Sequence, residues 1–155
     1  MIRLVLAFAL IVTGISARAE IDIQQVESPG GFNAWLVEDH SIPFVALELR
    51  FKGGGSLDLP GKRGATNLMV ATLEEGAADM DARDFAAARE AIAAELRFDL
   101  GDDTVSVSAK FLTETRDAAM GLLRAALIEP TFDETAVERV RQQVLANIRS
   151  DAKDP

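Results

Sequence analysis

Cysteine and tyrosine are missing from this chain of 155 residues, and histidine and tryptophan each occur once. Without cysteine the chain has no disulfide framework, no thiolate metal site and no thiol nucleophile. One histidine cannot supply a histidine-rich zinc site either. Basic residues are also few, because 16 lysines and arginines stand against 25 aspartates and glutamates. This balance argues against nucleic acid as a partner, since phosphate contacts require basic patches.

A targeting segment is predicted at residues 1–19. Arg3 provides a positive start, residues 4–12 form an unbroken apolar run, and residues 17–19 (ARA) fit a small-x-small cleavage site. The run is too short to span a membrane comfortably, and a retained N-terminal anchor is the alternative. We therefore expect cleavage before Glu20, export to the periplasm and no stable membrane span afterwards. The mature part would carry 14 basic against 25 acidic side chains, a net charge of −11.

Three strands are predicted in the first third of the mature chain. Residues 21–26 and 32–38 flank the turn sequence SPGG at 28–31 and should form a hairpin. Residues 43–51 (PFVALELRF) give the strongest strand signal. Their alternation places an apolar set on one face, namely Val45, Leu47, Leu49 and Phe51. The other face is mixed, which is typical of a sheet that helices cover on one side.

The sequence of the second half of the chain predicts a helix, two strands and two further helices. Their expected ranges are 81–94, 96–100, 104–112, 115–130 and 133 onward. Asp81 and Asp133 stand where helix N-caps are expected. The mature residues 20–155 are enough for one domain that buries about two-thirds of its unfolded surface. We predict an α+β fold, with a single antiparallel-dominated sheet and helices packed on one face.

The stretch at 61–76, GKRGATNLMVATLEEG, predicts a turn followed by a helix. Gly64 interrupts the preceding structure, whereas residues 65–75 contain neither glycine nor proline. Apolar residues recur near the i, i+3, i+4 spacing of a helix with a buried face. Gly76 stands where a helix C-cap is expected.

This stretch resembles the active-site helix of the pitrilysin/insulinase family of zinc peptidases, which carries the inverted motif H-x-x-E-H between flanking glycines. Gly64 and Gly76 match the flanking glycines. The two histidine-ligand positions then fall on Asn67 and Ala71, and the general-base glutamate position falls on Val70. The resemblance covers the order and spacing of elements in the whole mature chain. It implies the N-terminal domain of a metalloenzyme fold of the mitochondrial-processing-peptidase type.

The sequence IEPTF at 128–132 and the helix after it also resemble the family. In active members this helix carries the third zinc ligand, a glutamate shortly after a Glu-Arg-like pair. Matching Glu138 and Arg139 to that pair places the ligand position at Val140. No aspartate or glutamate occurs at 139–150, so a shift of a few residues supplies no ligand. The resemblance therefore implies a member with no catalytic or metal residues and no cofactor, whereas active relatives hold zinc.

Three other candidate sites are weaker. Residues 52–56 (KGGGS) lack the spacing of a phosphate-binding loop and are expected to form a flexible loop before the helix. His40 follows an aspartate in a turn and is expected to be a solvated loop residue. Glu74 and Glu75 have no nitrogen ligand beside them in sequence and are expected to form the solvated end of the helix.

Two functions remain open. The resemblance implies a non-catalytic member that acts as partner of a catalytically complete homologue and binds peptide substrates, with a second domain of similar fold beyond Pro155. The alternative is an α+β binding or scaffold protein unrelated to proteolysis. An autonomous metallopeptidase is the weakest hypothesis, because the sequence offers it no ligand residues.

Overall fold

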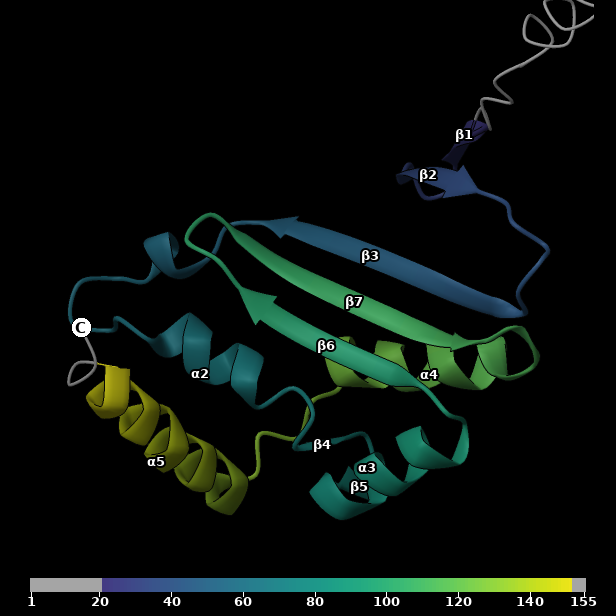
Figure 1. Ribbon diagram of the computed structural model, residues 1–155. Helices are drawn as coiled ribbons and strands as arrows, with labels where there is room; N and C mark the ends of the chain where they lie inside the picture. The colour runs from purple at the N-terminus through teal and green to yellow at the C-terminus, as the bar shows by residue number, and fades with distance from the viewer. Residues whose placement is uncertain (1–20, 152–155) are drawn as a thin grey trace, which may run out of the picture. The chain divides into compact units, whose positions relative to one another are not determined.

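The computed structural model describes residues 21–151 (Figure 1). The predicted targeting segment at 1–19 lies outside the described residues. The described residues fall into two compact units, and the chain passes from the first to the second between Ile42 and Pro43. None of the helices in the described range is long and apolar enough to cross a membrane.

The described residues of the first unit form an antiparallel hairpin. Strand β1 (Ile23–Glu27) pairs with β2 (Asn33–Val37). The turn between them is closed by Ser28, whose N–H donates to the carbonyl of Phe32 at 2.8 Å. Gly31 adopts a left-handed φ of 80°, which glycine adopts without strain. The predicted hairpin is confirmed, and every residue of both strands is exposed.

The second unit is built on a three-stranded antiparallel sheet in the order β3-β7-β6. These strands are β3 (Phe44–Lys52), β6 (Glu95–Leu100) and β7 (Thr104–Leu112). The second unit does not hold one sheet alone, because two short strands, β4 (Gly76–Ala77) and β5 (Met80–Asp81), form a separate two-stranded sheet. Strand β3 pairs with the distant β7 because both have nine residues and the same alternation, so their apolar rows share one face.

Helices cover the apolar face of this sheet (Figure 1). They are α2 (Ala65–Ala71), α3 (Ala82–Ala91) and α4 (Arg116–Ile128), and α5 (Glu134–Asp151) packs against α2. The buried core joins Val107, Ala109 and Phe111 of β7 to Phe85, Ala119, Leu122 and Leu123 of the helices. The predicted fold class, an antiparallel sheet with helices on one face, is therefore confirmed.

Both predicted aspartate caps are confirmed. The Asp81 carboxylate accepts hydrogen bonds from the N–H groups of Arg83 and Asp84, at 2.8 and 2.9 Å. The Asp133 carboxylate accepts bonds from the N–H groups of Thr135 and Ala136, at 3.0 and 3.1 Å. These bonds satisfy donors that the first helical turn leaves without partners.

The segment after α2 differs from the sequence prediction. Helix α2 ends at Ala71, where the backbone bonding changes to i−3 partners, as in the bond from the Thr72 N–H to the Met69 carbonyl at 3.1 Å. Gly76 is not the C-cap. It opens a two-residue strand, β4 (Gly76–Ala77), which pairs with β5 (Met80–Asp81). Two short 3-10 helices, η1 (Gly55–Leu57) and η2 (Thr113–Thr115), complete the unit.

Candidate functional site

Asp58 holds the N-terminus of α2. Its carboxylate accepts hydrogen bonds from the N–H of Gly64 at 2.6 Å and from the hydroxyl and N–H of Thr66 at 2.6 and 3.1 Å. The Thr66 hydroxyl, together with the backbone donors, lowers the pKa of Asp58 below its ordinary value. Gly64, with a φ of 94°, gives the chain the left-handed turn that directs it into the helix. The start of α2 is thus well defined without a capping side chain at Gly64.

The four motif positions lie on the two packed helices α2 and α5. Asn67 and Ala71 are exposed, whereas Val70 of α2 and Val140 of α5 are each only 5% exposed. Figure 1 shows α2 and α5 side by side. Asn67 lines a pocket of about 460 Å³ together with residues of the 52–58 loop and of the turn between β6 and β7. The structure thus packs together the two helices that carry the predicted ligand positions.

These residues do not fit a zinc ion. Catalytic zinc is held by imidazole nitrogens and carboxylate oxygens, and a nearby glutamate deprotonates the bound water. The carboxamide of Asn67 is a poor ligand, and the side chains of Ala71, Val70 and Val140 have no lone pair. Within residues 21–151, no group of three or more histidine, cysteine, aspartate or glutamate side chains is placed to hold a metal. No chemical step can therefore be assigned to zinc at these residues.

Glu74 and Glu75 are not the solvated helix end that the sequence predicts. The Glu74 carboxylate lies 2.5 Å from the guanidinium of Arg89 on α3, and Glu75 pairs with Arg139 on α5. Both glutamates are partly covered, because α3 and α5 each place an arginine against the segment that follows α2. Sequence reasoning missed the two arginines, since their pairing depends on helix packing that no local pattern encodes.

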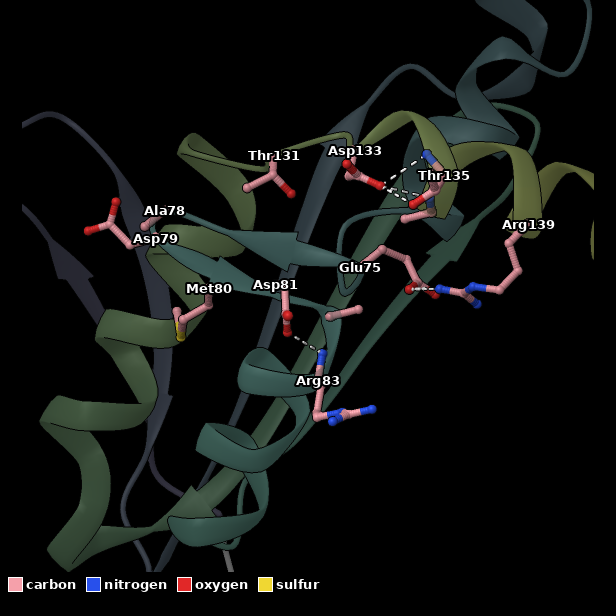
Figure 2. A pocket seen from close by; sticks show the side chains of 12 residues that line it. Glu75, Ala78, Asp79, Met80, Asp81, Arg83, Thr131, Asp133, Thr135 and Arg139 are labelled. Carbon is pink, nitrogen blue, oxygen red and sulfur yellow. Dashed lines mark hydrogen bonds and ion pairs between the residues drawn. The ribbon is translucent and has the colours of Figure 1, made fainter.

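A pocket of about 510 Å³ adjoins the second of these pairs (Figure 2). The β4–β5 hairpin, the segment around Thr131 and the first turns of α5 line it. Figure 2 shows the side chains of Glu75 and Arg139 directed toward each other on one wall. The aspartates that cap α3 and α5, Asp81 and Asp133, also line it, and their carboxylates are occupied by backbone donors. The sequence contained no motif that predicted this pocket.

His40 lies in an exposed turn, as expected. Its Nε2 atom is 3.2 Å from a carboxylate oxygen of Glu38, and its side chain is 87% exposed. A histidine in this setting has no buried partner to orient it for catalysis.

Comparison with known proteins places the chain among domains of peptidase family M16. The profile of the family described as Insulinase (Peptidase family M16) matches residues 34–155. The "Non-peptidase homolog YmxG" of Helicobacter pylori is 31% identical over 139 residues, which cover 90% of this chain and 31% of that protein. A crystal structure of a peptidase M16 inactive domain from Pseudomonas fluorescens matches with a TM-score of 0.80 and 26% identity, over 87% of this chain and 33% of that one.

A fourth match supports the fold alone. The crystal structure of a protease from Helicobacter pylori has a TM-score of 0.71 at 15% identity, over 84% of this chain and 31% of that one. This chain spans about a third of the length of the relatives it matches.

The fold and the site together define a peptidase M16 type of domain that lacks the catalytic motif. The chain belongs to the insulinase family, peptidase family M16.

Proposed function

We propose that the protein is a non-catalytic member of the insulinase family that assists a catalytically complete zinc peptidase in peptide binding or degradation. The observation that carries this proposal is the retained motif helix. Helix α2 is anchored by Asp58 and packs against α5, while Val70 and Val140 bury apolar side chains where the family places carboxylates. The names of two relatives, a non-peptidase homolog and an inactive domain, support the absence of activity.

Peptide binding is the second part of the proposal. Strand β6 is an edge strand among the described residues, because its single ladder partner is β7. It also lies beside α2, the helix at the motif position. An extended peptide can add a further strand to such an edge through backbone hydrogen bonds, with little dependence on its sequence. This geometry suits a partner that holds peptide chains for another subunit to cleave.

The proposal is tested by assaying the intact protein with and without a homologue that carries H-x-x-E-H from the same source. Alone, the protein should not hydrolyse peptides, because no group activates water. The mixture should cleave faster than the homologue alone. A mixture with the homologue's motif glutamate changed to glutamine should be inactive. Hydrolysis by the protein alone would contradict the proposal. Equal rates with and without the protein, and no complex in size-exclusion chromatography, would contradict the partner role.

The proposed setting is the periplasm. The charged start, apolar run and small-x-small sequence of residues 1–19 support export. Mass spectrometry of the protein from a periplasmic extract should find Glu20 as the first residue. Recovery of an intact Met1 from the cytoplasm would overturn this assignment.

A further inference from the structure

The segment that follows α2 and the helix α5 are joined by an ion pair that needs no metal. Glu75 follows α2 by four residues, and its carboxylate pairs with the guanidinium of Arg139, one turn inside α5. The Glu75 side chain is 21% exposed and that of Arg139 is 57% exposed. Partial burial of the carboxylate reduces the screening that weakens fully exposed ion pairs.

Two apolar side chains lie on the same pair of helices. Val70 on α2 and Val140 on α5 are buried, and Arg139 directly precedes Val140. A glutamate at either position would leave a carboxylate out of water without a metal to neutralise it, which is unfavourable. Valine at both positions removes this cost and adds apolar burial.

In the family pattern, zinc would connect these helices, since two ligand positions fall on α2 and one on α5. We infer that this chain replaces the metal bridge by a metal-independent link, in which the Glu75–Arg139 pair and the buried Val70 and Val140 hold α5 against α2. The inference concerns how the helices are held and does not depend on the proposed partner role. The link also fixes one wall of the pocket in Figure 2, because Glu75 and Arg139 both line it.

Hydrogen exchange of the α5 amides in the intact protein tests this link. Arg139→Gln should accelerate exchange along α5 about two- to fivefold, the range expected for a partly buried ion pair, with little change in α4. Glu75→Gln should have the same effect, and the double variant should be no worse than either single one, since both remove one contact. Adding EDTA should leave the exchange of the unmodified protein unchanged.

Arg141→Gln is the matched control. Arg141 lies two residues further along α5 and is similarly exposed, but its partner Glu138 is on the same helix. Its loss should therefore leave the exchange of α5 close to that of the unmodified protein. Val140→Ala should accelerate exchange as Arg139→Gln does, which tests the apolar half of the link. Equal effects of Arg139→Gln and Arg141→Gln, or faster α5 exchange on adding EDTA, would overturn the inference.

Discussion

Replacing Gly54 with alanine should lower the free energy of unfolding by about 2–4 kcal/mol. A Cβ atom at this position would lie 2.2 Å from the carbonyl oxygen of Gly101 and 2.7 Å from that of Asp102. Both neighbours are backbone atoms, so the 52–58 loop would have to move away from the β6–β7 turn. The φ of Gly54 is −151°, outside the left-handed region, so the cost comes from lost space.

That movement would break a set of hydrogen bonds between the loop and the turn. The N–H groups of Gly53, Gly55 and Ser56 donate to carbonyls of residues 101–103 at 2.8 to 3.1 Å. The Ser56 hydroxyl also donates to the Asp103 carboxylate at 2.9 Å. Each such bond contributes about 0.5–1.5 kcal/mol net, so losing even two of them adds to the steric cost.

Gly55→Ala is the control for this prediction. The nearest atom to a Cβ at Gly55 is the Leu100 Cδ2 at 3.8 Å, an ordinary van der Waals contact. Its substitution should change stability by less than about 1 kcal/mol. Urea denaturation followed by circular dichroism measures both variants. Equal stability of the two variants would show that the loop does not pack against the turn as described.

The contact between the 52–58 loop and the β6–β7 turn could not be predicted from the sequence. The run KGGGS was expected to form a flexible loop, because glycine permits many conformations. In the structure its glycines permit close backbone contact with a turn nearly fifty residues away. A local pattern gives no information about such a contact, since the partner is brought there by the pairing of β3 with β7.

The elements with strong periodicity were predictable. Strand β7 was predicted at 104–112, and these are its observed bounds. The alternation of apolar and polar residues directly indicates a strand with one buried face. The aspartate caps of α3 and α5 were predicted for a similar reason, since capping is a local interaction. The end of α2 was predicted too far along the chain, because residues 65–75 contain no glycine or proline, whereas the backbone leaves the α-helix after Ala71.

The sequence assigned the candidate positions to helices but not to their surroundings. Asn67, Val70 and Ala71 could be placed on one helix from the flanking glycines, and Val140 on a second helix. The structure adds that the two helices pack together and that the valines are buried whereas Asn67 and Ala71 are exposed. The ion pairs of Glu74 and Glu75 depend on the packing of helices and could not be predicted from the sequence.

The second prediction is that the protein does not bind zinc. The family places two ligands one helical turn apart so that both project from one face toward the metal. A site that loses one of its three protein ligands keeps some affinity for zinc, but in this chain all three positions lack a good ligand. No inner set of ligands remains for surrounding residues to orient. The protein should therefore neither retain zinc during purification nor gain stability when zinc is added.

Elemental analysis of the intact protein, purified without chelators and dialysed against zinc-free buffer, tests the central claim most directly. We predict far less than one zinc per chain, both in the unmodified protein and in Asn67→Ala. One tightly held zinc per chain that is lost in Asn67→Ala would contradict the account, because it would show that the motif helix still binds the metal.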